Sequence, residues 1–144
     1  MKRHESIAPL SRDHHSTLIL AQLLKKNAPL YRDLPEYAKD KAAYAQQQFE
    51  AHIKKHFEQE EVMLEKVKGI LPEIDELAIE IRNEHQVLRT LIRSLGDLPV
   101  TDEKLDDLGN KLEGHIRKEE RVLFPLLQQY CTEEKLREIH RLLH

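Results

Sequence analysis

The sequence HIRKEERVLFP, residues 115–125, is the main indication of the fold, because residues 56–64, HFEQEEVML, repeat its pattern. Both copies read HxxxEExxL. In an α-helix, residues four apart lie on one face, with their Cβ atoms roughly 5 to 6 Å apart. The histidine and the first glutamate of each copy can therefore bind one metal ion together.

The residues before each copy place its histidine on the buried face of a helix. The apolar residues that precede the two histidines by seven and three positions are Phe49 and Ile53, and Leu108 and Leu112. Apolar residues at such spacings form the stripe that a helix turns toward the core. We therefore expect His56 with Glu60, and His115 with Glu119, to face the interior.

Length and composition favour a single all-α domain. The chain has 144 residues, of which 34% are charged, with 4 Gly, 6 Pro and no Trp, and its apolar residues recur at helical spacing. The lone Cys131 can form neither an internal disulfide nor a thiolate metal site. A net charge of -3 with interspersed signs shows no basic stripe for nucleic acid. No signal peptide or long apolar run stands out, so we expect a soluble cytoplasmic protein without membrane contact.

Proline and glycine divide the chain into five expected helices. They span residues 8–27, 36–68, 72–95, 102–130 and, as a short final helix, 133–143. Pro125 should kink or locally open the fourth. Short connections between four long helices predict an up-down-up-down antiparallel four-helix bundle with a short C-terminal helix, in one domain that spans residues 1–144.

The first and third expected helices each add a histidine to an apolar stripe. His85 lies in the middle of the stripe of residues 72–95. In the first helix the choice is between the neighbours His14 and His15. His15 has apolar residues at the same offsets as His85, so helical phase favours His15, with His14 as the alternate.

These positions together bring imidazoles and carboxylates from four helices to the bundle core. The predicted metal ligands are His15 (alternate His14), His56, Glu60, His85, His115 and Glu119. Imidazole with carboxylate suits iron, manganese or zinc, and the missing thiolates argue against iron–sulfur clusters. Two divalent ions would retain positive charge beside two glutamates, which calls for hydroxide, oxide or another anion between the metals.

Four motifs follow one another along nearly the whole chain: RDHH, HFEQEE, NEHQVL and HIRKEERVLFP. Through them the chain resembles hemerythrin-like (HHE cation-binding) domains. The resemblance implies an antiparallel four-helix bundle with a non-haem di-iron centre, in which Glu60 and Glu119 bridge the metals and histidines complete the coordination. It also implies dioxygen binding, sensing of iron or oxygen, or handling of reactive oxygen and nitrogen species.

The functional hypothesis is a binding protein whose oxo- or hydroxo-bridged pair of Fe ions binds dioxygen or a related diatomic or peroxide ligand. Zn or Mn could substitute for iron. No acid–base or nucleophile constellation stands beside the ligands, which favours a binding protein over an enzyme. The alternatives are a di-iron enzyme that acts on peroxide or nitric oxide, and a role in iron storage or repair.

Five other residues near the motifs are expected to have lesser roles. Glu61 and Glu120 each follow a ligand by one position, about 100° around the helix, and Glu84 precedes His85. We interpret all three as surface charges or as hydrogen-bond acceptors behind the ligands. His52 should be solvated or support a ligand. Core packing is favoured for Tyr44 over a role as hydrogen-bond donor to a bound oxygen ligand.

Overall fold

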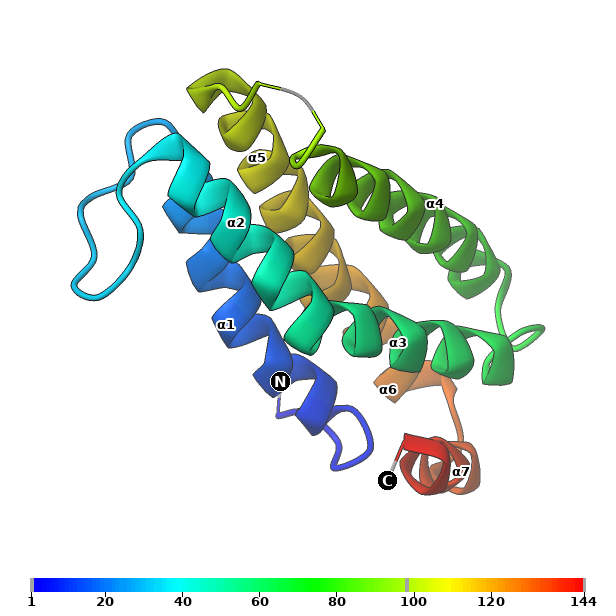
Figure 1. Cartoon of the computed structure of the whole chain (residues 1–144). Coiled ribbons are helices and arrows are strands. Elements are labelled where there is room, and N and C mark those ends of the chain that lie inside the picture. The colour runs from blue at the N-terminus through cyan, green and yellow to red at the C-terminus, as the bar shows by residue number, and fades with distance from the viewer. Residues whose placement is uncertain (1, 98, 144) are drawn as a thin grey trace.

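Within residues 2–97 and 99–143, which the computed structural model describes, all regular secondary structure is helical (Figure 1). The elements are α1 (Ala8–Leu24), α2 (Ala38–Gln48), η1 (Phe49–Ile53), α3 (Lys54–Lys66), α4 (Pro72–Ser94), α5 (Asp102–Lys118), η2 (Glu119–Leu123), α6 (Phe124–Tyr130) and α7 (Glu133–Leu143), of which η1 and η2 are π-helical. The all-α class is confirmed. No helix in the described part of the chain is both long and apolar enough to span a bilayer.

The expected helices agree with the observed ones apart from their ends. The first ends at Leu24, because Lys25 is extended, and its backbone N–H bonds to the carbonyl of Gln22. The second begins at Ala38 and consists of α2, η1 and α3 in unbroken succession, while α5, η2 and α6 form the fourth. Thr101 caps α5, where its hydroxyl accepts a hydrogen bond from the backbone N–H of Lys104.

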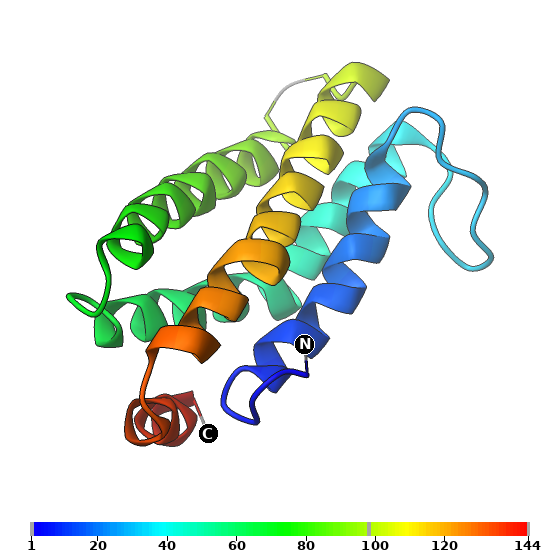
Figure 2. The ribbon, with the colours of Figure 1, turned by 180° about the vertical axis from the view of Figure 1, so that it is seen from behind.

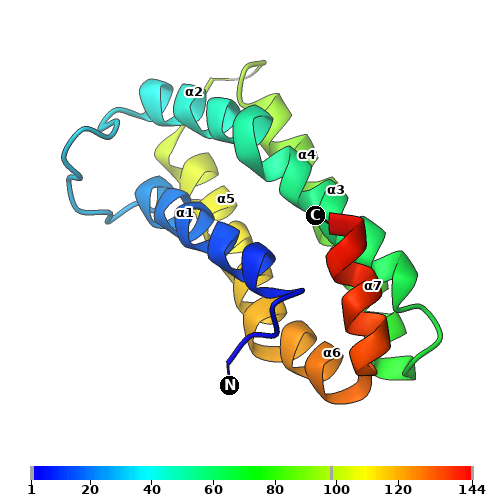
Figure 3. The ribbon, with the colours of Figure 1, turned by 90° about the horizontal axis from the view of Figure 1, so that it is seen from below.

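The long helices pack side by side. In Figures 1 and 2, α1 lies beside α5, and α4 lies along the other side of α5. Figure 3 shows α7 against α3, near the end of α6. The α3 segment turns away from α2 at η1. The strict up-down-up-down order of a four-helix bundle stays a prediction.

The core consists of two apolar clusters with a polar layer between them. One cluster includes Leu20, Phe57, Leu88 and Leu112, and the other includes Leu10, Met63, Ile81 and Leu123. Four long helical rods carry the predicted ligands: α1; α2 with η1 and α3; α4; and α5 with η2 and α6. On each rod, the buried polar residues come between a residue of one cluster and a residue of the other. Apolar packing on both sides therefore holds the helices in place around the buried polar groups.

Pro125 opens its helix locally, as expected. It has no N–H to donate to the carbonyl four residues earlier, and the turn before it is the π segment η2, where the N–H of Phe124 bonds to the carbonyl of Glu119. The wider turn thus begins at a predicted metal ligand. The other π segment, η1, contains no proline, and no residue in it indicated a π-helical turn. Such segments often occur at functional sites.

Gly109 sets the distance between α1 and α5. A Cβ atom at this position would lie 2.7 Å from the carbonyl oxygen of Ala21 and 3.2 Å from the Cβ of Leu24. The first of these distances is too short for any side chain, and a backbone atom cannot rotate away. The absence of a side chain therefore lets the two helices approach closely enough to share the polar layer.

Replacing Gly109 by alanine should destabilise the protein. The added Cβ would meet a backbone atom, so we expect an overpacking cost in the upper part of the usual range of roughly 1 to 3 kcal/mol. This exceeds the gain of about 1 kcal/mol in helix propensity. The matched control is Gly114→Ala in the same helix, where nothing lies within 4 Å of the added Cβ. We expect the control to raise the midpoint of urea unfolding and Gly109→Ala to lower it. Equal shifts in the two variants would show that the helix contact does not depend on Gly109.

Candidate metal centre

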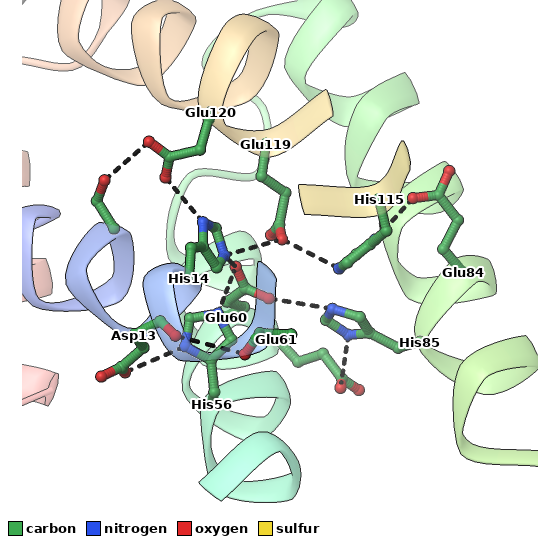
Figure 4. Close-up of polar contacts among 12 residues, drawn as sticks. Asp13, His14, His56, Glu60, Glu61, Glu84, His85, His115, Glu119 and Glu120 are labelled. Carbon is green, nitrogen blue, oxygen red and sulfur yellow. Dashed lines mark hydrogen bonds and ion pairs between the residues drawn. The ribbon is translucent and has the colours of Figure 1, made fainter. Parts of the chain in front are cut away.

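Histidine and glutamate side chains from four rods converge in the polar layer (Figure 4). The residues are His14 of α1, His56 and Glu60 of α3, His85 of α4, His115 of α5 and Glu119 at the start of η2. They form two groups: His14, His56, Glu60 and Glu119, and Glu60, His85, His115 and Glu119. In each group the four possible ligand atoms lie within 4.8 Å of one another, and both carboxylates belong to both groups.

The structure places His14 in this cluster and leaves His15 exposed on the surface. The preference for His15 is therefore wrong, and the alternate is the inner residue. The phase of α1 is not the one that the sequence suggested, because Thr17 is buried while Leu18 is only partly buried. The short polar Thr17 sits on the inner face together with His14, and the apolar pattern of the helix did not reveal it.

The Nε2 atoms of the histidines face the two carboxylates. The Nε2 of His56 lies 3.2 Å and that of His85 3.1 Å from Glu60. The Nε2 of His14 lies 3.3 Å and that of His115 3.0 Å from Glu119. All of them are within reach of a shared ion, and Figure 4 shows the imidazoles pointing toward the glutamates.

Most of these inner atoms lack a hydrogen-bond partner. They are the Nε2 atoms of His14, His56 and His115, the Oε2 of Glu60 and both carboxylate oxygens of Glu119. Buried polar atoms in proteins are nearly always paired, and leaving several unpaired in one place is costly. A set of nitrogen and oxygen atoms that converge without partners is what a metal site requires, so these residues fit bound cations.

Each histidine bonds to a second carboxylate through its Nδ1 atom. The pairs are His14 with Glu120 (2.7 Å), His56 with Asp13 (3.2 Å), His85 with Glu61 (3.1 Å) and His115 with Glu84 (2.7 Å). An imidazole whose Nδ1–H donates to a carboxylate presents its Nε2 lone pair to a metal, which also orients the ring. Glu61, Glu84 and Glu120 are thus acceptors behind the ligands, one of the two roles that the sequence left open.

These outer carboxylates form a ring around the centre. Each of these acids is next to a predicted ligand in sequence and accepts a hydrogen bond from a histidine on a neighbouring helix. The bonds run from α3 to Asp13 of α1, from α4 to Glu61 of α3, from α5 to Glu84 of α4, and from α1 to Glu120 of η2. Sequence reasoning missed Asp13. Its position directly before His14 matches that of Glu84 before His85, and this parallel is the signal that could have found it.

Three of the four outer carboxylates also bind a basic side chain. Arg3 lies 3.3 Å from Glu120, Arg89 lies 2.5 Å from Glu61, and Lys118 pairs with Glu84. Within the described part of the chain, Asp13 forms no ion pair with a lysine or arginine, and 54% of its side chain is exposed. The centre is therefore closed by a salt bridge behind three histidines and open behind His56.

The comparison with known families agrees with this geometry. The model of the hemerythrin HHE cation binding domain matches residues 5–127. The chain belongs to this family. Neither the curated proteins nor the solved structures that were searched gave a match. The HHE domain therefore combines membership of a cation-binding family with a His/Glu cluster that fits metal ions.

Electrostatic contacts in the HHE domain favour the charged forms of the site residues. Burial disfavours charged imidazoles, but the nearby carboxylates of Glu119, Glu120 and Glu60 outweigh it and raise the pKa of His14 to about 12. In the same way, Glu60 and Asp13 raise the pKa of His56 to about 9. Against burial, His56 and His14 hold the pKa of Glu60 well below its usual value. In the protein alone, His14 and His56 are thus imidazolium groups beside the carboxylate of Glu60.

The pKa of His115 follows the same rule. Burial alone would lower it, but the negative charge of Glu119 and the hydrogen bond to Glu84 raise it to about 10.

Two phenylalanines hold imidazole rings in the HHE domain. The ring of Phe57 stacks on His85 with 4.0 Å between centroids, and Phe124 stacks on His14 at 5.6 Å. The rings of His85 and His14 are therefore oriented by both a hydrogen bond and an aromatic contact.

Tyr44 packs against the apolar core, as expected. His52 is exposed and belongs to neither ligand group.

Loading the HHE domain with metal should release protons. A ligating imidazole must be neutral, whereas His14, His56 and His115 carry protons at pH 7 because their pKa values are about 12, 9 and 10. We expect up to three protons to leave per chain. Apparent affinity should rise with pH, less steeply above about pH 9, where His56 has already lost its proton. Calorimetric titration in buffers of different ionisation enthalpy counts the protons. Loading without proton release would contradict the charged network.

The variant Glu119→Ala should lose at least one bound metal and keep its helical content. The carboxylate belongs to both ligand groups, whereas the helix around it is held by apolar packing on both sides. Metal analysis and far-ultraviolet circular dichroism measure the two quantities. The control is Glu58→Ala, which removes an exposed carboxylate from α3. An unchanged metal content in Glu119→Ala would remove Glu119 from the site.

Proposed function

We propose that this HHE domain is a non-haem di-iron protein that binds dioxygen or a related small ligand. The observation that carries the proposal is the sharing of Glu60 and Glu119 by two ligand groups. Two groups with separate carboxylates could bind two unrelated ions. Two groups with common carboxylates favour a pair of ions bridged by both glutamates.

The donor set supports iron. Each group offers imidazole nitrogens and carboxylate oxygens, and neither group contains a thiolate. Such mixed nitrogen and oxygen ligands suit iron, and manganese or zinc could replace it. Family membership points the same way, because the matching model is that of a cation-binding domain.

The number of donors supports an exogenous ligand. Four imidazole nitrogens and four carboxylate oxygens cannot saturate two octahedral ions. Two divalent ions would also keep a net positive charge beside two glutamates, which favours a hydroxide, an oxide or another small anion between them. Iron ions with open positions and two accessible oxidation states supply the chemistry of reversible small-ligand binding.

The remaining residues hold the ligands in place. Asp13, Glu61, Glu84 and Glu120 accept the Nδ1–H bonds and fix the tautomers. Phe57 and Phe124 cover imidazole faces and exclude water. Among the described residues, the side-chain hydrogen bonds and ion pairs of the six proposed ligands involve only one another and these four acids. A free acid or base beside the ions, as an enzyme would use, is not among these partners, so binding is the favoured function.

Anaerobic loading with ferrous iron tests the proposal. We expect two irons per chain by metal analysis, and an optical spectrum that changes on exposure to dioxygen and returns under argon. The double variant Glu60→Ala/Glu119→Ala is the control and should show neither. Recovery of a single tightly bound zinc, or of no metal, would contradict the di-iron centre. Steady consumption of peroxide or nitric oxide by the loaded protein would instead establish the enzymatic alternative.

A further inference from the structure

A surface cavity of about 530 Å³ lies against one side of the metal centre. Residues of α1, η1 and α3 line it, among them Asp13, Thr17, Ala51, His52 and His56. His56 is the one predicted ligand that contributes to this cavity. The cavity therefore leads from the surface to the edge of a ligand ring.

The hydrogen bond at the inner end of the cavity is the least protected of the four outer pairs. Glu120, Glu61 and Glu84 have side-chain exposures of 24%, 32% and 29%, and each is held by Arg3, Arg89 or Lys118. Asp13 is 54% exposed and, in the part of the chain that the structure describes, forms its ion pair with His56 alone. Turning His56 outward breaks one contact with an exposed acid, whereas moving another ligand histidine disturbs a carboxylate that a basic side chain holds.

The four histidines also differ in side-chain exposure, and His56 is the most exposed of them. The side chain of His56 is 7% exposed, against 3% for His14, 0% for His85 and 1% for His115. His85 and His115 also both contact the ring of Phe57, with Arg89 on that ring. The half of the centre formed by His85 and His115 is thus closed, and the half formed by His14 and His56 is accessible at one ligand.

We propose that this cavity is the exchange port of the metal centre, through which the divalent cation held by His14 and His56 enters and leaves. Asp13 is a positioning residue that holds His56 at the inner end of the port. The inference rests on the proposed two-metal function and adds to it that the two metal positions are inequivalent, with one exchangeable ion and one retained ion.

Chelator competition tests the inequivalence. The protein is loaded with cobalt(II), which is visible in the optical spectrum, its stoichiometry is measured, and it is mixed with excess chelator. We expect two ions to leave in two kinetic phases. His56→Ala should remove the fast phase and His115→Ala the slow one, and circular dichroism verifies that both variants keep their helices.

A matched pair of outer-carboxylate variants tests the role of Asp13. Loss of an outer carboxylate commonly weakens metal binding by about 10- to 100-fold. Asp13→Asn should therefore accelerate the fast phase by about 10- to 100-fold and leave the slow phase unchanged. Glu84→Gln, which makes the equivalent change behind His115, should accelerate only the slow phase. A merely structural role for Asp13 would alter both phases together.

A second matched pair tests the port itself. Ala51 is exposed on the rim of the cavity, so Ala51→Trp should fill the opening and slow both loading and release of the fast ion several-fold. Ala43→Trp is the control, because Ala43 is also exposed on the same helical rod but lines a different pocket. It should leave both phases unchanged.

The outcomes separate the two proposals. Two bound ions that leave in a single phase, or an unaltered fast phase in Ala51→Trp, would overturn the port and leave the two-metal function standing. Acceleration of the same phase by Asp13→Asn and Glu84→Gln would also overturn it. A chain that binds fewer than two ions would overturn both proposals, and the stoichiometry shows this before any mixing.

Discussion

Two carboxylates, Glu60 and Glu119, lie at the centre of the protein with no exposed surface. A buried negative charge is costly unless opposite charges or metal ions surround it, and the surrounding residues are arranged in layers that meet this requirement. Imidazoles face the two glutamates, a second layer of acids faces the imidazoles, and basic side chains face three of those acids. Charge alternates outward from the centre, so every layer stabilises the one inside it.

The apolar core depends on this arrangement and also supports it. The buried charges divide the core into two clusters, and packing in both clusters keeps the four rods at the distance at which the ligand atoms meet. Gly109 permits the close approach of α1 and α5 on one side. Pro125 and η2 change the helical turn where Glu119 enters the site. Small features of the backbone thus decide the geometry of the charged centre.

The internal repeat gives the centre its symmetry, and the outer residues break it. The HxxxEE copies on α3 and on α5 with η2 each contribute one histidine and one glutamate to the buried cluster. The acids behind the histidines, however, differ in exposure and in their basic partners, and Asp13 is the most open of the four. The two His/Glu groups, which are alike in composition, therefore differ in their access to solvent.

The helices and most residues of the buried His/Glu cluster could be predicted from the sequence. Spacing of four residues fixes His56 with Glu60 and His115 with Glu119 on single helical faces, because that geometry is local to one helix. His85 followed from its place in a strong apolar stripe. Tertiary structure alone decided between His14 and His15, because the phase of α1 depends on burial of Thr17 in place of Leu18. It alone also paired Asp13 with His56, which are 43 residues apart, since only packing of α1 against α3 brings their side chains together.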